Sequence, residues 1–172
     1  MNMEFADTRN IYWYAVHVRS RHEFKVFERL TKSGIEAFLP VVERLNRWKD
    51  RKKLINFPLF SGYLFVHIYS DNTLPVLKTN GVVRLLGAIS GEPQPIPEEQ
   101  IISLKKLIES KGEIDPYPYL KEGERVRIKS GPLAGIEGIL TEKRGQHMLV
   151  VSVDVLRQGA ALKIATSDVE KI

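Results

Sequence analysis

The stretch Asn56-Phe57-Pro58-Leu59-Phe60-Ser61-Gly62-Tyr63-Leu64-Phe65-Val66 decides the fold of the N-terminal half. It opens a run of apolar residues that predicts a central β-strand over residues 63–69. The stretch also carries more large apolar side chains than one face of a strand can bury. Core packing accounts for Leu64 and Val66, or for the opposite alternate set, whereas Phe60 and Tyr63 lie beside a Pro/Gly bend. We therefore predict that Phe60 and Tyr63 line an exposed apolar pocket that binds a protein partner.

Strand and helix signals alternate around this stretch. Strands are predicted at residues 12–18, 35–40, 63–69 and 82–89, helices after residue 20 and at 71–79 and 98–109, and a hairpin or loop at 44–53. The pattern S-x-x-E at Ser20–Glu23 predicts an N-cap at Ser20, followed by a helix that buries Phe24, Phe27 and Leu30 and stops at Gly34. This order suits an α/β sandwich, in which helices pack on an antiparallel sheet.

A boundary is expected at residues 111–121, where Gly112, Pro116 and Pro118 oppose both helix and central strand and favour an extended linker. Beyond it only strands are predicted, at residues 125–129, 137–142, 148–153, 160–165 and 169–171. Short strands joined by tight turns suggest a small five-stranded β-barrel. The fold class is thus α+β, with domains at 1–110 and 122–172 joined by a flexible linker.

Composition excludes most catalytic chemistry. The 172 residues contain no cysteine, so disulfides, thiolate metal sites and cysteine nucleophiles are excluded. The four histidines lack metal-ligand spacing, and neither G-x-S-x-G nor H-E-x-x-H occurs. We predict no enzyme, metal or cofactor. The longest apolar run, residues 11–16, is too short to cross a bilayer, and the first ten residues do not resemble a secretory signal. A cytoplasmic monomer without membrane contact is expected.

The positive charge is concentrated in one window. The net charge is +5, yet residues 17–53 alone hold eleven cations against five anions. Arg19 and Arg21 are predicted beside a helix N-terminus that can hold a phosphate, with His22 and Lys25 next to them. A second cluster surrounds Trp48, with Arg47 and Lys49 as its neighbours, and suits nucleic acid because cations hold phosphates while a ring stacks on a base. The alternatives are a solvated helix face and a flexible loop.

Several segments in this order resemble the NusG family of transcription elongation factors across nearly the whole chain. The strand Trp13-Tyr14-Ala15-Val16, the stretch Pro58–Val66 and Asn80-Gly81-Val82-Val83 are similar to its N-terminal (NGN) domain. Glu122–Ile128 and Ser130–Gly138 are similar to its KOW domain. The resemblance implies an α/β sandwich followed by a five-stranded barrel. Within the family, Arg21-His22-Glu23, residues 34–40 and residues 48–53 look most like specialised antiterminators of polysaccharide operons, the UpxY-type and RfaH-like paralogues.

The resemblance also implies partners and roles. Such factors grip the clamp helices of the largest RNA polymerase subunit, and the positions here are Phe60 and Tyr63, with Trp13 and Tyr14. They contact the non-template DNA strand, here through the region from Arg19 to Lys25, and suppress pausing or termination. Their KOW domain recruits a partner such as a ribosomal protein or Rho, through a loop that here holds Leu156.

Three departures and two alternatives accompany this hypothesis. Ser61 and Asn80 replace prolines that are common in the family, and Leu156 stands where an aromatic residue is frequent. The alternatives are the general housekeeping NusG factor and, from another class, a KOW-bearing RNA-binding or ribosome-associated protein. An exposed aromatic pocket favours a polymerase-binding factor, because a pure RNA binder does not need one. The β-branched residues of the C-terminal half, such as Val150 and Val151, predict strands there in the full-length chain.

Overall fold

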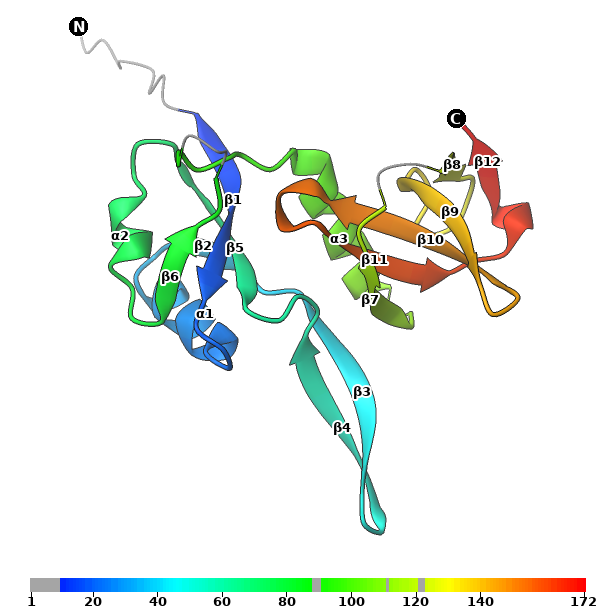
Figure 1. Cartoon of the computed structure of the whole chain (residues 1–172), viewed down its shortest axis with the longest axis horizontal. Helices are drawn as coiled ribbons and strands as arrows, with labels where there is room; N and C mark the ends of the chain where they lie inside the picture. The colour runs from blue at the N-terminus through cyan, green and yellow to red at the C-terminus, as the bar shows by residue number, and fades with distance from the viewer. Residues whose placement is uncertain (1–9, 88–90, 111, 121–122) are drawn as a thin grey trace, which may run out of the picture.

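The structure is a computed structural model that describes residues 10–87, 91–110, 112–120 and 123–172. It contains an N-terminal sheet, a hairpin that projects from it and a C-terminal sheet, with one helix between the two larger sheets (Figure 1). The predicted α+β fold class is confirmed.

The N-terminal sheet has four strands in the order β2-β5-β1-β6, and all neighbouring strands are antiparallel. Its two central strands are nearly continuous apolar runs, as expected for strands covered on both faces. The elements of this part are β1 (Ile11–Val18), α1 (Glu23–Lys32), β2 (Glu36–Phe38), β5 (Tyr63–Tyr69), the short α2 (Leu74–Leu77) and β6 (Val82–Leu85). The predicted strand at residues 63–69 is confirmed with the same bounds.

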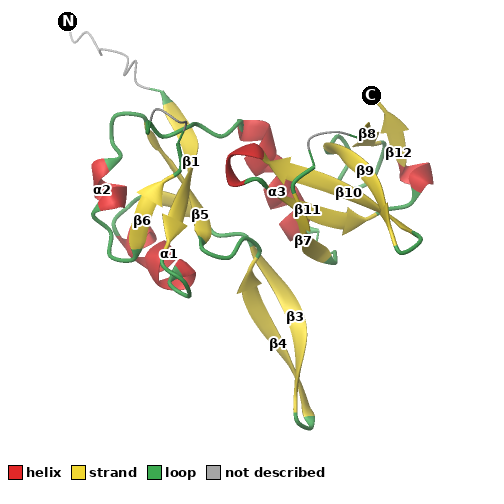
Figure 2. Ribbon diagram, viewed as in Figure 1, coloured by secondary structure: helices red, strands yellow, loops and turns green. Residues whose placement is uncertain are grey.

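A long hairpin interrupts this part of the chain. Strands β3 (Val41–Trp48) and β4 (Arg51–Pro58) pair only with each other and extend away from both larger sheets (Figure 2). We call β3, β4 and their turn the arm. Of the two alternatives for residues 44–53, the structure has the hairpin.

The C-terminal sheet has six antiparallel strands in the order β12-β8-β9-β10-β11-β7. Its elements are β7 (Ile114–Pro118), β8 (Glu124–Ile128), β9 (Glu137–Lys143), β10 (Gln146–Val153), the 3-10 turn η1 (Asp154–Leu156), β11 (Gln158–Lys163), the 3-10 turn η2 (Thr166–Asp168) and β12 (Val169–Lys171). Val150 and Val151 lie in β10, and the described residues of this half contain strands and two short 3-10 helices but no α-helix, so the strand prediction for this half of the full-length chain is confirmed.

Two expectations for this half need correction. The predicted flexible linker contains β7, which is extended but pairs along its length with β11, from Ile114 opposite Leu162 to Pro118 opposite Gln158. The predicted five-stranded barrel is not detected, because among the described residues no pairing joins β12 to the other end of the sheet. Since β7 occupies the outer edge of β11, that edge is not available for closure.

Helix α3 (Glu98–Glu109) connects the two parts, with the bounds that the sequence predicts. It contacts β1 on one side and β10 on the other. Its buried residues are Ile101, Leu104 and Leu107, and Ile108 is partly buried.

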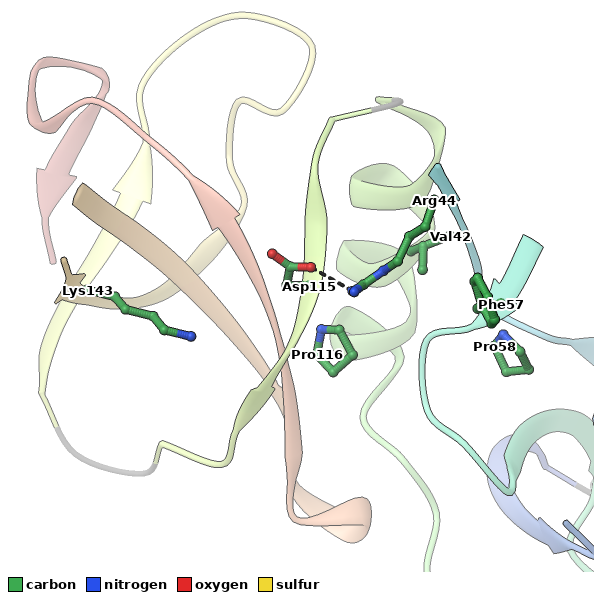
Figure 3. A pocket seen from close by; sticks show the side chains of 7 residues that line it. All are labelled: Val42, Arg44, Phe57, Pro58, Asp115, Pro116 and Lys143. Atoms are coloured by element: carbon green, nitrogen blue, oxygen red, sulfur yellow. Dashed lines mark hydrogen bonds and ion pairs between the residues drawn. The ribbon is translucent and has the colours of Figure 1, made fainter. Parts of the chain in front are cut away.

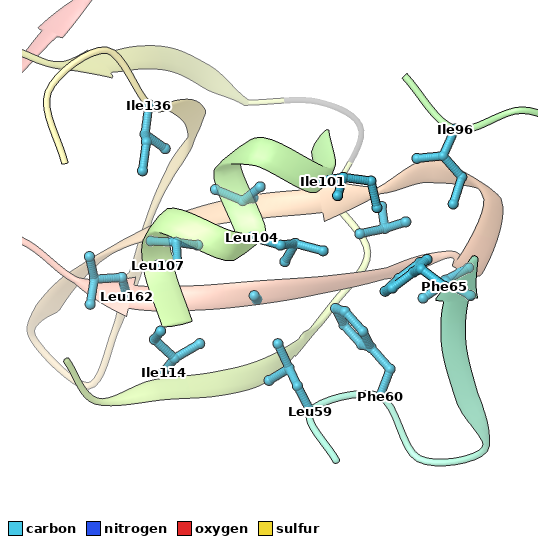
Figure 4. Packing of buried hydrophobic residues seen from close by; sticks show 14 of the residues in the cluster. Leu59, Phe60, Phe65, Ile96, Ile101, Leu104, Leu107, Ile114, Ile136 and Leu162 are labelled. Carbon is cyan, nitrogen blue, oxygen red and sulfur yellow. The ribbon is translucent and has the colours of Figure 1, made fainter. Parts of the chain in front are cut away.

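The buried side chains form two main groups. One lies between the N-terminal sheet and α1 and includes Tyr14, Val16, Val26 and Leu30. The other, which we call the shared cluster, contains residues of both halves and of α3 (Figure 4). Its members are Trp13, Ala15, Leu59, Phe60, Phe65, Leu86, Ile96, Ile101, Leu104, Leu107, Ile114, Val126, Ile128, Ile136, Leu149, Val151, Val153, Leu156, Ala160 and Leu162. The two halves are therefore packed together in this structure.

Candidate functional site

The four predicted aromatic residues do not form one pocket. Successive side chains of a strand point to opposite faces of its sheet. In β1, Trp13 belongs to the shared cluster, whereas Tyr14 packs among the residues that face α1. Burial also raises the pKa of the Tyr14 hydroxyl, with a smaller contribution from Tyr12, so Tyr14 is neutral at physiological pH. Tyr14 is therefore part of the core on the face opposite Trp13.

The predicted exposure of Phe60 is wrong. Its side chain is only 1% exposed and packs edge-to-face on Phe65, with 6.3 Å between the ring centroids. In Figure 4, Phe60 and Leu59 extend from the turn before β5 toward the interior that α3 and the C-terminal sheet enclose. The turn does present an aromatic side chain as predicted, but the rest of the chain covers it.

Trp13 and Tyr63 lie near this turn, and each has an aromatic partner. The Trp13 ring stacks on His67 at 4.7 Å, and the ammonium of Lys105 from α3 lies 4.6 Å from the Trp13 ring centroid. Tyr63 is half-buried and stacks on His17 at 5.2 Å. Of the four predicted residues, Tyr63 is thus the one that reaches the surface, with a polar hydroxyl at its tip.

Of the predicted phosphate-binding residues, Arg19, Arg21 and His22 lie in a turn before α1, and Lys25 lies in the first turn of that helix. Arg21 has a positive φ of 62°, and the His22 N–H donates to the Arg19 carbonyl at 3.0 Å. Arg19, Arg21 and Lys25 are exposed, and His22 is half-buried. The structure therefore gathers these four residues at one end of the N-terminal sheet and leaves their cations free to contact an anion.

The predicted N-cap at Ser20 is wrong. Helix α1 begins at Glu23 with His22 as its N-cap, and no side chain caps it. Because Arg21 is in the left-handed region, the chain cannot continue as helix from Ser20. Of the predicted buried face of α1, Leu30 is buried and Phe27 is partly buried, whereas Phe24 is 46% exposed and Val26 is buried instead.

Glu23 is the residue of the candidate site that sequence reasoning missed. It is 4% exposed, and its Oε1 accepts a hydrogen bond from the Gly62 N–H at 2.8 Å. The Gly62 carbonyl in turn accepts a hydrogen bond from the Val18 N–H at 2.8 Å, and Gly62 has a φ of 83°. The S-x-x-E pattern singles out Glu23, but its carboxylate holds the turn after Phe60 and not the helix start.

Three turns therefore meet where β1 ends. The Arg19 N–H donates to the Gly81 carbonyl at 2.9 Å, and the Arg29 guanidinium donates to the Asn80 carbonyl at 2.7 Å. We call residues 19–22 the basic turn and residues 59–62 the aromatic turn. Together with the Glu23–Gly62 bond, these contacts join the basic turn, the aromatic turn and the turn before β6 to one another. This end of the sheet, with its exposed cations and the half-buried Tyr63, is the candidate site.

The second predicted basic cluster lies at the tip of the arm, whereas the first lies at the start of α1 (Figure 1). Arg47 and Lys49 are exposed, and the backbone of Trp48 pairs with Arg51, while the Trp48 side chain lies outside the described residues. The base of the arm faces the C-terminal half across a hollow of about 570 Å³. There the Arg44 guanidinium donates to the Asp115 carboxylate at 2.6 Å (Figure 3).

Leu156, the predicted contact for a C-terminal partner, is 7% exposed and belongs to the shared cluster. The turn that carries it is tied to α3, because the Gln100 side chain donates to Asp154 Oδ2 at 3.1 Å and accepts from the Asp154 N–H at 3.3 Å. In this arrangement Leu156 contacts the chain's own interior, which the sequence did not predict.

The described residues contain no group of three histidine, aspartate or glutamate side chains placed to hold a metal ion. Within the same part of the chain, no helix combines the length and apolar composition that are needed to cross a membrane.

Comparison with known proteins relates this arrangement to one family. Residues 11–105 match the family model described as transcription termination factor NusG. The transcription termination/antitermination protein NusG of Staphylococcus aureus (strain N315) is 33% identical over 175 residues, covering 93% of this chain and 95% of that protein. The protein of the same description from Borreliella burgdorferi is 26% identical and covers 93% and 98%. A solved structure titled "Domain interaction in Thermotoga maritima NusG" superposes with a TM-score of 0.53 at 22% identity, covering 95% of this chain and 98% of that one.

Proposed function

The chain belongs to the NusG family of transcription termination/antitermination factors, and from this premise we propose that it binds RNA polymerase in the elongation complex, contacts the non-template DNA strand and suppresses pausing or termination. As a member of this family it is a transcription factor and not an enzyme. We propose that it acts as a cytoplasmic monomer.

The observation that carries this proposal is the meeting of three turns at the end of β1. Glu23 and the backbone of Arg19 hold the basic turn against the turns that contain Gly62 and Gly81. These contacts hold Arg19, Arg21 and Lys25, which we propose face the DNA, beside the turn that carries Phe60 and Tyr63. A rigid unit with these two surfaces suits a factor that bridges polymerase and the displaced DNA strand.

The burial of Phe60 adds a requirement to this function. Phe60 and Trp13 lie in the shared cluster, whose members include residues of α3 and of the C-terminal sheet. The clamp helices can reach Phe60 only after this packing opens. Opening also exposes Leu156, the position proposed to bind a C-terminal partner such as a ribosomal protein or Rho.

The test is capture of RNA polymerase by the full-length protein. A Phe60→Leu, Tyr63→Ala double variant should lose at least about tenfold in affinity, because central aromatic anchors typically contribute about 2 kcal/mol or more. Phe57→Ala, at a partly exposed position on the base of the arm, is the matched control and should bind normally. Undiminished capture by the double variant contradicts clamp binding through these residues.

The DNA contact has its own test. Crosslinkers placed at Arg21 and Lys25 in a paused elongation complex should label the non-template strand. Labelling of nascent RNA alone would instead support the RNA-binding class of function.

We further propose that the factor serves one operon, of the polysaccharide type, rather than all genes. The basic turn before α1 and the segments that resemble UpxY-type and RfaH-like paralogues support this specialisation. RNA sequencing after deletion of the gene tests it: loss of distal transcripts from one operon is expected. A change across most transcription units would indicate the general housekeeping role.

A further inference from the structure

We propose that the arm is a ribbon for duplex DNA, which enters the major groove and contacts the phosphates of both groove walls. This inference deepens the nucleic-acid contact of the proposed function and rests on that function for bringing DNA beside the protein. It concerns the hairpin alone and not the turns at the end of β1.

The segment of the arm from residue 44 to residue 53 is strongly basic and open to solvent. Between residues 44 and 53 there is one anion, Asp50, and six cations, namely Arg44, Arg47, Lys49, Arg51, Lys52 and Lys53. All six cations are exposed. Among the described residues only Arg44 of these six forms an ion pair, with Asp115 at the base of the arm. The remaining five are available to replace the counterions of a polyanion.

The pairing register places these cations on both faces of the ribbon. Arg47 lies opposite Lys52, and residues directly opposite each other in an antiparallel pair share a face. Lys53 and Arg51 alternate with Lys52 along β4, so they lie on the other face. A single DNA strand that runs along one surface of the arm would contact cations on one face only. The major groove of duplex DNA has two phosphate walls, so it can contact cations on both faces of the arm.

The dimensions of the arm fit a major groove. Strand β3 has eight residues, and at about 3.3 Å per residue the ribbon reaches about 23 Å from its base. The major groove of B-DNA is about 12 Å wide and 8.5 Å deep and admits a two-stranded β-ribbon. The distal half can therefore enter while the base stays outside, where the Leu59 N–H bonds the Pro40 carbonyl at 2.8 Å and Arg44 bonds Asp115.

The experiment titrates the full-length protein into a fluorescent 20-base-pair DNA duplex at low salt and follows anisotropy over a salt series. If Arg47, Lys52, Arg51 and Lys53 each contact one phosphate, the slope of log affinity against log salt should be about −3.6, at about −0.9 per phosphate. Arg47→Ala with Lys52→Ala, and separately Arg51→Ala with Lys53→Ala, should each reduce the slope to about −1.8, because each pair removes one wall. Lys78→Ala with Lys129→Ala removes the same charge elsewhere and should leave the slope unchanged.

Two comparisons separate groove entry from general attraction. A single strand of the same length should bind more weakly than the duplex. An RNA duplex should also bind more weakly, because the major groove of A-form RNA is deep and too narrow for side chains to read. Equal binding of single strand or RNA duplex, or a loss of slope from only one of the two faces, would overturn the proposal.

The same variants keep this proposal distinct from polymerase binding. The Phe60→Leu, Tyr63→Ala variant should bind the duplex as the parent does, whereas both arm variants should still capture polymerase. Loss of duplex binding in the aromatic variant would assign the DNA contact to another surface and contradict the arm as its site. Normal duplex binding with no polymerase capture by the parent would refute the proposed function and leave the arm proposal standing.

Discussion

Replacing Phe60 with alanine should lower the free energy of unfolding by about 3–5 kcal/mol, the range found when a buried phenyl ring is removed from a core. The side chain is 1% exposed and shares the interior with Phe65, Leu59 and residues of α3. Its edge-to-face contact with Phe65 accounts for about 0.5–1.5 kcal/mol of this loss. An exposed Phe60, as the sequence alone suggests, would predict a change within about 0.5 kcal/mol.

Urea unfolding followed by tryptophan fluorescence measures this difference directly, since Trp13 is buried in the same shared cluster. Phe57→Ala is the matched control: the same ring is removed from a position that is 40% exposed, and we expect a loss of about 1 kcal/mol or less. A Phe60→Ala loss no larger than that of Phe57→Ala would refute the packing of the two halves described here. That result would indicate that Phe60 is exposed and available to a protein partner.

Three further predictions follow from individual contacts. Glu23→Ala should destabilise the protein by about 1–3 kcal/mol because it leaves the Gly62 N–H without its acceptor. Glu23→Gln keeps an acceptor oxygen and should destabilise the protein less. Equal losses of unfolding free energy in urea would contradict this role of Glu23. Gly138→Ala should be strongly destabilising, because a Cβ there would lie 2.6 Å from the Val150 carbonyl oxygen. Gly131→Ala would meet open space and should cost only the strain of its positive φ, about 1–2 kcal/mol. Thermal unfolding of the two variants compares these losses of stability. Asp115→Asn should cost at most about 1 kcal/mol and lose its effect in high salt, because both partners of the Arg44–Asp115 pair are about half exposed; a larger, salt-independent loss in urea unfolding would indicate a buried interaction.

Local signals explain which elements could be predicted from the sequence. Residues 63–69 and 98–109 carry strong strand and helix patterns of their own, and both elements have the predicted bounds. The start of α1 could not be predicted in the same way. Its position depends on the left-handed conformation of Arg21 and on a hydrogen bond that the Glu23 carboxylate accepts from the Gly62 N–H, 39 residues away.

The exposure of the cations in the candidate site could be predicted from the sequence, but the burial of Phe60 could not. The cations of the basic turn are exposed as expected, because long charged side chains seldom lose their solvent. The burial of Phe60 and Leu156 depends on contacts between halves that lie far apart in sequence, which no local pattern encodes. Similarly, Pro116 and Pro118 exclude a central strand, but they are compatible with an edge strand, and β7 lies at the edge of its sheet.

The pairing of β7 with β11 limits how far the two halves can separate. While β7 stays in the sheet, only residues 110–113 tether α3 to the C-terminal half, and a fully extended chain from residue 109 to residue 114 reaches roughly 17 Å. If β7 peels from β11, the tether extends to residue 124 and its reach rises to roughly 52 Å. Separation of the two halves is therefore limited in two steps: the β7–β11 pairing sets a short reach, and loss of that pairing would make the reach about three times as long.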